Sequence, residues 1–218
     1  MSIGDNQHSR EAVLARVRAA LGRKGPDDEA RAAAHAWLAA RRQGPRPALP
    51  ADLVQRFLQR AADMSSTTAH VSALEDVPAE VARYLAGAHR RAVCWPALAE
   101  LDWSRAELQV DARVTSGDDA VGITGCFCAI AETGTLVFAS AIDAPPTTFL
   151  LPETHVAIVR ADQIVAGMEE AFARLREERG ALPRAVNLVS GPSRTGDIEQ
   201  TIVLGAHGPR HVHIVLVG

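Results

Sequence analysis

Apolar residues along the first third of the chain recur at the three- and four-residue spacing of amphipathic helices. Glycine–proline pairs interrupt this pattern at Gly25-Pro26 and Gly44-Pro45, where a helix cannot continue. The apolar faces are narrow. These helices are therefore expected to form an N-terminal extension, residues 1–64, that packs on the main domain or on another chain. The predicted helices cover residues 9–21, 27–42 and 51–62.

After residue 64 the pattern changes to short runs rich in Val, Ile and Leu that alternate with helical segments. This alternation predicts one α/β domain, residues 65–218, with a largely parallel sheet. The continuous apolar runs 156–159 and 186–189 are typical of strands buried on both faces. Residues 118–131 are expected to mix a helix with a turn, and residues 197–204 to form a short helix or turn. Strands are predicted at 69–71, 91–95, 107–114, 135–139, 155–159, 185–189 and 211–217, and helices at 77–89 and 161–179.

Composition narrows the class of protein. The chain has 218 residues, of which 47% are hydrophobic, enough for a sizeable core. A net charge of -3, without basic runs interleaved with aromatics, argues against a nucleic-acid partner. The polar N-terminal residues do not resemble a signal peptide, and no apolar run is long enough to span a bilayer. A cytoplasmic location is therefore expected.

Cysteine and histidine usage gives little sign of a metal centre. The three cysteines do not suggest a disulfide framework, although Cys126 and Cys128 would share one face of a strand. An iron–sulfur cluster needs roughly four thiolates, more than this chain holds. His211 and His213 alternate on the last predicted strand, but a zinc site would need at least one more ligand. We therefore expect no metal or cofactor in this chain. We also expect the three cysteine thiols to be buried.

Four turn-like motifs in the last third of the chain set glycine or proline beside hydroxyl, carboxylate or imidazole groups. Glycine lets a backbone approach a ligand closely, and the polar side chains supply contacts. Because the motifs lie between predicted strands, we expect them to form one composite polar site. The motifs are Ala131–Thr135, Leu150–His155, Gly191–Glu199 and Gly205–Pro209.

The loop from Ser190 to Glu199 follows a predicted strand, as ligand-binding loops do at the carboxyl ends of open α/β sheets. Its backbone amides and hydroxyls could bind an anion. Asp197 and Glu199 instead favour a cation or a donor-rich ligand. Alternatively the loop is a plain strand-to-helix turn, in which Ser193, Thr195 or Asp197 caps the helix.

Three further residues have chemical and structural interpretations. Glu132, beside Gly134, would serve as a general base or nucleophile, or its carboxylate would bond nearby amides and fix a tight turn. His155 and His207 would donate to a substrate or act in acid–base chemistry, or be structural. The sharp turn at Gly208-Pro209 needs no ligand to explain it.

The order of these motifs resembles the LUD-domain family, over roughly residues 67–218, and the helical N-terminus is also similar to that family. The resemblance implies a three-layer α/β/α fold related to ribose-phosphate isomerase, glucosamine-phosphate deaminase and CoA-transferases. It also implies a non-redox role in oxidising L-lactate to pyruvate with two iron–sulfur partner proteins, which would carry the clusters. A small carboxylate or nucleotide-like ligand is expected, and the chain would form a complex or a homo-oligomer.

The resemblance leaves the mechanism open. In related CoA-transferases a glutamate beside glycine forms a covalent thioester, and Glu132 is similar in type. Alternatives are therefore an independent acyl- or CoA-transferase or isomerase using Glu132, and a regulatory or scaffold protein. Many family members carry a basic residue shortly before Leu-Leu-Pro, where this chain has Pro145–Thr148, so that anion contact is either absent here or supplied elsewhere, for example by Arg194. Predicted catalytic residues are Glu132 and His207; predicted ligand-binding residues are Thr133, Gly134, Thr135, His155, Ser193, Arg194, Thr195, Asp197, Glu199 and Gly208.

Overall fold

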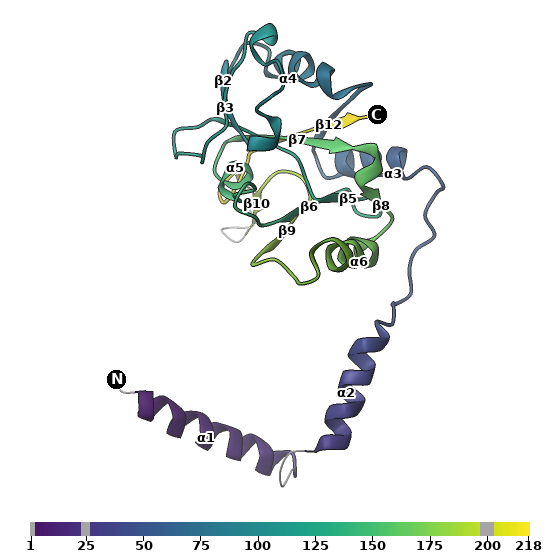
Figure 1. Ribbon diagram of the computed structural model, residues 1–218, viewed down its shortest axis with the longest axis vertical. Coiled ribbons are helices and arrows are strands. Elements are labelled where there is room, and N and C mark those ends of the chain that lie inside the picture. Colours follow the sequence, from purple (N-terminus) through teal and green to yellow (C-terminus); the bar gives the residue numbers. More distant parts are fainter. Residues whose placement is uncertain (1–2, 23–26, 197–202) are drawn as a thin grey trace. The chain divides into compact units, whose positions relative to one another are not determined.

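The computed structural model describes residues 3–22, 27–196 and 203–218. Its contacts divide the chain into a unit that ends at Pro47 and a second unit from Ala48 to Gly218 (Figure 1). Helix α3 (Leu53–Asp63), which the sequence analysis grouped with the N-terminal extension, lies in the second unit. Its Phe57 and Ala61 are fully buried in the core of that unit.

The first unit consists of α1 (Ile3–Ala20), which begins six residues before the predicted start at residue 9, and α2 (Asp28–Ala40), close to its predicted position. Asp27 caps α2, because its carboxylate accepts a hydrogen bond from the Ala30 N–H at 2.9 Å. No residue of α2 is buried, and Trp37 is 65% exposed. No helix in the described part of the chain is both long and apolar enough to cross a membrane.

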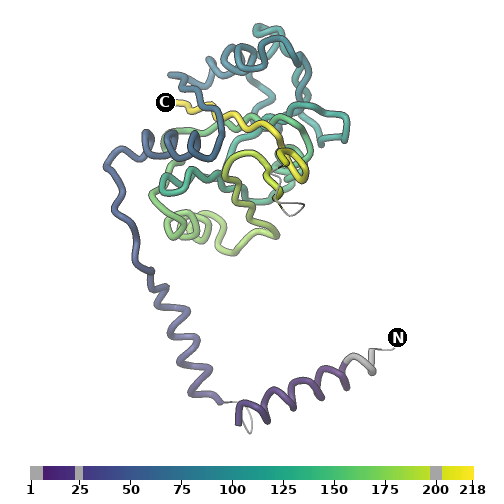
Figure 2. The backbone as a smooth tube through the Cα atoms, turned by 180° about the vertical axis from the view of Figure 1, so that it is seen from behind, coloured from purple at the N-terminus to yellow at the C-terminus, as the bar shows by residue number. Residues whose placement is uncertain are grey.

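The second unit is built on a six-stranded sheet in the order β1-β12-β7-β4-β2-β3, in which every pairing is parallel. This confirms the predicted α/β class with a mostly parallel sheet. Strand β12 lies between β1 and β7 and runs through the middle of the unit, in yellow in Figure 2. The strands are β1 (Thr67–Val71), β2 (Arg91–Cys94), β3 (Gln109–Asp111), β4 (Val121–Thr124), β7 (Thr154–Arg160) and β12 (His211–Val217).

One face of this main sheet is covered by α4 (Val77–Leu85; Figure 1) and by the turns that follow β2. Val77 and Val81 of α4, together with Trp103, pack against the alternate residues of β4 and β7 that face them. Pro78 is accommodated because it lies in the first turn of α4, where the missing N–H has no helical partner.

The other face is covered by α3, the short helix α5 (Thr147–Leu150) and a second sheet in the order β8-β5-β6-β9. The Phe138 and Phe149 rings stack there with centroids 4.1 Å apart. Helix α6 (Met168–Arg179) packs on the outer face of the second sheet, so this side has a strand layer beneath its outer helix. The second sheet comprises β5 (Cys128–Ile130), β6 (Thr135–Ala139), β8 (Ile164–Val165) and β9 (Val186–Val189).

Three local predictions were wrong. Residues 118–131 form β4 and β5 and contain no helix. The helix predicted from residue 161 begins at Met168, because Ile164 and Val165 pair with β5 instead. Strand β9 is not buried on both faces but lies at the edge of the second sheet, with Leu188 43% exposed. In each case the strand partner, which the local pattern does not specify, decided the outcome.

Two glycines let the end of α3 press against the loops of the second sheet. Gly134, in the β5–β6 turn, has φ +69°, and a Cβ there would lie 2.5 Å from the Ala61 nitrogen. Gly191, after β9, has φ +76°, and a Cβ there would overlap the Met64 carbonyl oxygen. Both positions require glycine for backbone conformation and for space.

Replacing Gly134 with alanine should lower the free energy of unfolding by about 2–4 kcal/mol, the sum of left-handed strain and overpacking. Gly180→Ala is the matched control, since Gly180 also has φ +69° but nothing lies within 4 Å of its Cβ position. That variant should lose only the conformational part, about 1–2 kcal/mol. Urea unfolding measures both, and equal losses would contradict the proposed contact with α3.

Candidate functional site

The predicted ligand-binding loops gather at the amino end of the parallel sheet. The loop Leu150–Glu153 precedes β7 and the loop Gly205–Pro209 precedes β12, and these strands start in register at Thr154 and His211. The loop after β9 reaches the same edge and forms a two-residue pairing, β10 (Arg194–Thr195) with β11 (Val203–Leu204). The expectation that this loop follows a parallel strand at its carboxyl end was wrong, because β9 belongs to the antiparallel part of the second sheet.

Ser193 joins its own loop to the loop before β12, and Gly208 of that second loop lies against the loop before β7. Its N–H donates to the Pro209 carbonyl at 2.9 Å, and its own carbonyl accepts from the Gly205 N–H at 3.0 Å. Its hydroxyl accepts from the His207 N–H at 3.4 Å. A Cβ at Gly208 would lie 3.3 Å from the Ser193 Cβ and 3.9 Å from the Leu150 carbonyl oxygen. The loops therefore form one connected assembly.

The β5–β6 turn is tied to the same assembly by hydroxyl groups. The Thr133 and Thr135 hydroxyl oxygens are 2.7 Å apart, and Thr135 is 2.7 Å from the Ser190 hydroxyl. The Arg194 guanidinium donates to the hydroxyl of Ser65, just after α3. The four motifs are thus linked through a continuous set of contacts, and Arg194 is engaged with the protein itself.

The two predicted catalytic residues lie on different loops. Glu132 is half-buried in the β5–β6 turn, where its N–H donates to the Ala166 carbonyl at 3.0 Å. His207 is exposed on the loop before β12. Among the interactions of the described residues, none joins these two side chains. Asp197 and Glu199 lie outside the described residues.

His155 lies in the core and not on a ligand-binding loop. It is fully buried on β7, and its Nε2 is 2.8 Å from the Thr124 hydroxyl. The Phe138 and Phe149 rings lie 5.7 and 5.9 Å from the imidazole. Burial lowers the pKa of His155 to about 3, so the ring is neutral near pH 7. This buried position indicates a structural role for His155, because the ring cannot contact a ligand at the surface.

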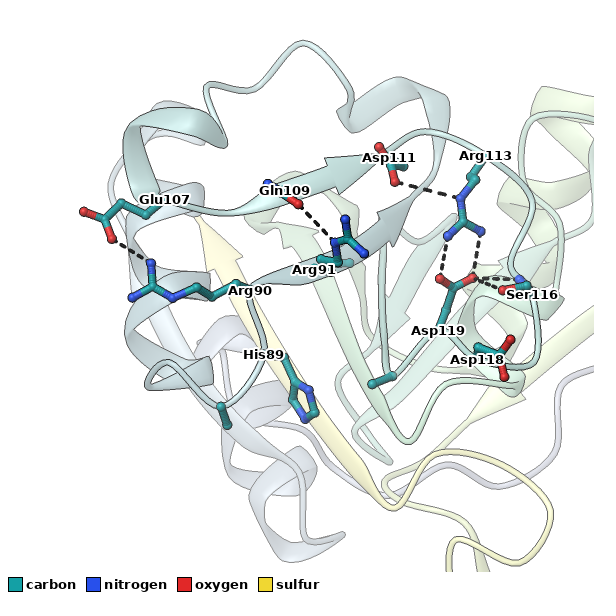
Figure 3. A pocket seen from close by; sticks show the side chains of 13 residues that line it. His89, Arg90, Arg91, Glu107, Gln109, Asp111, Arg113, Ser116, Asp118 and Asp119 are labelled. Carbon is teal, nitrogen blue, oxygen red and sulfur yellow. Dashed lines mark hydrogen bonds and ion pairs between the residues drawn. The ribbon is translucent and has the colours of Figure 1, made fainter.

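Two adjoining cavities open at the amino edge. One, of about 420 Å³, is lined by two of the motif loops through Leu151, Glu153, Gly205 and Gly208, together with Arg210. The other, of about 840 Å³, lies at the starts of β2 and β3 (Figure 3). Both include the segment 118–120, so they share a wall.

The larger cavity is polar, lined by three arginines and four carboxylates. Arg113 binds Asp119 through two hydrogen bonds of 2.8 and 2.6 Å, which lower the pKa of Asp119 to about 2 (Figure 3). Arg90 similarly pairs with Glu107 at 2.9 Å. Sequence reasoning missed these residues, since the only local signal is an Asp-Asp pair after a Ser-Gly turn.

The three cysteines occupy three different core clusters. Cys94 packs beneath α4, Cys126 lies between the two sheets, and Cys128 lies under α6. Cys126 and Cys128 do not share a strand face, because β5 begins only at Cys128. Burial raises the pKa of Cys94 and of Cys128 to about 11, and raises that of Cys126 as well. All three are therefore thiols, not thiolates, near pH 7.

The two histidines of β12 are also separated. His211 is exposed, whereas His213 is buried and stacks on Tyr84 with ring centroids 3.8 Å apart. Its Nδ1 is 2.8 Å from the Thr67 hydroxyl. Across residues 3–22, 27–196 and 203–218, no three His, Cys, Asp or Glu side chains are grouped to hold a metal ion.

Comparison with known proteins gives the class. The LUD domain matches residues 55–217, from α3 to the end of β12. The chain therefore belongs to the LUD domain family. It is similar to Lactate utilization protein C of Deinococcus radiodurans, with 35% identity over 186 residues, 80% of this chain and 84% of that protein. Lactate utilization protein C of Bacillus subtilis is 33% identical over 127 residues, 56% of this chain and 53% of that protein.

A solved structure agrees with the fold. The crystal structure of a DUF162 family protein from Deinococcus radiodurans matches with a TM-score of 0.59 and 27% identity. The match covers 79% of this chain and all of that one.

The buried histidines predict acid sensitivity. Burial lowers the pKa of His213 to about 4, despite the opposing effect of Glu80, and that of His155 to about 3. The unfolded chain binds these protons near pH 6.5, so stability should fall as pH drops from 6.5 towards 4, by up to about 1.4 kcal/mol per pH unit for each histidine. Urea unfolding between pH 7 and pH 4 should show a smaller slope for His213→Gln and an unchanged slope for His211→Gln. Identical slopes in all three proteins would refute this assignment.

Proposed function

We propose that this protein is a non-redox subunit of a lactate-utilisation system, in which it supports the oxidation of L-lactate to pyruvate together with iron–sulfur partner proteins. The observation that carries the proposal is the connected loop assembly around Ser193. The family motifs supply its loops, and two of these loops border a cavity at the amino edge of the sheet. Relatives that share 35% and 33% identity with this chain are named for lactate utilisation.

The cysteines support assigning the redox centres to other chains. Oxidation of lactate to pyruvate releases two electrons and two protons, which an acceptor must take up. Iron–sulfur clusters are held by several thiolates. The cysteines of this chain are buried in separate clusters with raised pKa values. In our proposal, clusters on partner proteins accept the electrons.

The smaller amino-edge cavity offers a small carboxylate one cation, Arg210, beside the lining carboxylates Asp118, Asp119 and Glu153. Arg210 lines it, and a guanidinium binds a carboxylate through two charge-assisted hydrogen bonds. Gly205 and Gly208 line it as well, which allows close approach of a ligand to the backbone. Arg194 donates to Ser65 and does not line this cavity, so Arg210 is the cation that would bind the carboxylate.

Deletion of this chain from a host without another lactate dehydrogenase should abolish growth on L-lactate, and the wild-type gene should restore it. Arg210→Gln should lower lactate-dependent dye reduction by complemented extracts at least about tenfold, through loss of a charge-assisted contact. Arg184→Gln is the control, because this exposed arginine lines neither amino-edge cavity. Melting temperatures of both variants should match that of the wild type.

Purification of the tagged chain from lactate-grown cells tests the partners separately. Iron–sulfur proteins should co-elute, and omission of this chain from the reconstituted mixture should lower dye reduction. Growth on lactate after deletion would overturn the lactate assignment. If deletion abolishes growth on lactate as expected but no iron–sulfur protein co-elutes, only the partner assignment would be overturned.

One observation favours a second candidate, acyl or CoA transfer. Glu132 is half-buried next to the hydroxyl series Thr133, Thr135 and Ser190. Its carboxylate would attack an acyl-CoA carbonyl and form a mixed anhydride, with CoA thiolate as the leaving group. The thiolate would then attack the glutamyl carbonyl, giving a glutamyl–CoA thioester and releasing the carboxylate.

Trapping tests this candidate directly. Incubation with acetyl-CoA followed by borohydride should reduce the glutamyl thioester to an alcohol, detected by peptide mass spectrometry at residue 132. Glu132→Gln should give no such product, whereas Glu153→Gln, a change in a neighbouring loop, should not affect trapping. Unmodified Glu132 in the wild-type protein would exclude the covalent route.

A further inference from the structure

A cavity of about 450 Å³ lies at the opposite, carboxyl edge of the main sheet, where none of the four motifs reaches. Trp95 follows β2, Gly125 follows β4 and Arg160 ends β7, and all three line this cavity. The chain leaves β2 towards β3 but leaves β4 towards β7, on opposite sides. The space between β2 and β4 is therefore a topological switch point, the place where open α/β sheets bind ligands.

We propose that this cavity is a second binding site, for a small organic oxyanion, carboxylate or phosphate, attached to an apolar body. The proposal is independent of the lactate assignment, which concerns the amino edge. Its volume falls in the range of about 300–1,000 Å³ typical of small-molecule sites.

Gln163 fixes two of the segments that line the cavity. Its amide nitrogen donates to the Cys126 carbonyl at 3.1 Å, and its amide oxygen accepts from the Arg160 N–H at 3.0 Å. One side chain thus fixes the segments that follow β4 and β7. Because these segments are already ordered, a ligand would not have to arrange them on binding.

Arg179 is the group that would bind the oxyanion. Three arginines line the cavity, but Arg160 pairs with Asp162 at 3.1 Å and Arg174 pairs with Glu178 at 2.6 Å. The Arg179 guanidinium lies over the Phe127 ring, 5.9 Å from its centroid, and no carboxylate in the described part of the chain pairs with it. Phe127 therefore positions a guanidinium whose hydrogen-bond donors can face a ligand.

Apolar side chains supply the rest of the lining. Trp95, Leu98 and Ile158 form part of the wall, and the Trp95 indole is fixed by donating to the Pro145 carbonyl at 3.3 Å. Ile142, next to the lining residues Ala141 and Asp143, is fully exposed at the rim. An apolar body would cover such surface, whereas Asp143 and Glu178 would repel a ligand with several negative charges.

Fluorine NMR of the full chain labelled with 5-fluorotryptophan tests the proposal, because Trp95 is the one of three tryptophans that lines the cavity. Signals are assigned with Trp37→Phe, Trp95→Phe and Trp103→Phe. Benzoate and phenyl phosphate combine an oxyanion with an apolar ring. Acetate and inorganic phosphate have the oxyanion without the ring, and benzyl alcohol has the ring without the oxyanion. At least one aromatic oxyanion should shift the Trp95 signal saturably and bind at least about tenfold more tightly than the single-feature probes. Which of the two does so identifies carboxylate or phosphate.

Variants locate the binding. Arg179→Gln should weaken binding about tenfold or more, as expected for loss of a charge-assisted hydrogen bond. Ala97→Phe, which fills the cavity from its exposed side, should weaken it as well. Arg210→Gln, at the amino edge, should bind normally. Absence of a saturable Trp95 shift, wild-type affinity in both cavity variants, or equal loss in Arg210→Gln would overturn the proposal. None of these results bears on growth on lactate.

Discussion

Close contact between backbones at a few glycines holds the layers of this protein together. At Gly122, in the middle of the parallel sheet, a Cβ would overlap the Thr148 carbonyl of α5, and Gly134 and Gly191 contact the end of α3 in the same way. These contacts place α5 and α3 directly on their neighbours. The loop after α5 and the turn after β5 then have fixed positions, so the linkage of the motif loops depends on glycines that carry no chemistry of their own.

The two edges of the main sheet differ in chemistry. At the amino edge, loops joined by main-chain hydrogen bonds border cavities whose arginines Arg90 and Arg113 are paired with carboxylates. At the carboxyl edge, aromatic and aliphatic groups surround Arg179, which lies over an aromatic ring. The motifs that mark the family belong to the first edge, while the topological rule for ligand binding points to the second. In our two proposals, the two edges of one sheet bind two unlike ligands.

The sequence predicted the parts of this structure that local patterns determine. The continuous apolar run before Arg160 is a buried parallel strand, and the motifs do form one connected assembly. It could not predict β8, since two apolar residues before a helix become a strand only through pairing with β5. Nor could it place His155 in the core or pair Arg113 with Asp119, because both depend on contacts between separate segments. It also pointed to the wrong sheet edge, since the loop after β9 was expected at the carboxyl end of a parallel strand and the motif loops lie at the amino edge.

The position of β12 has a consequence for synthesis of the protein. This strand lies between β1 and β7, and its contact with β1 joins residues 146 positions apart, Thr67 and His213. Until residue 217 has left the ribosome, β1 has no sheet to join and β7 presents an unpaired edge rich in Val and Ile. Such edges pair readily with other chains. The nascent chain therefore exposes this edge until β12 is inserted, and a truncation within β12 should leave the edge open to pairing with other chains.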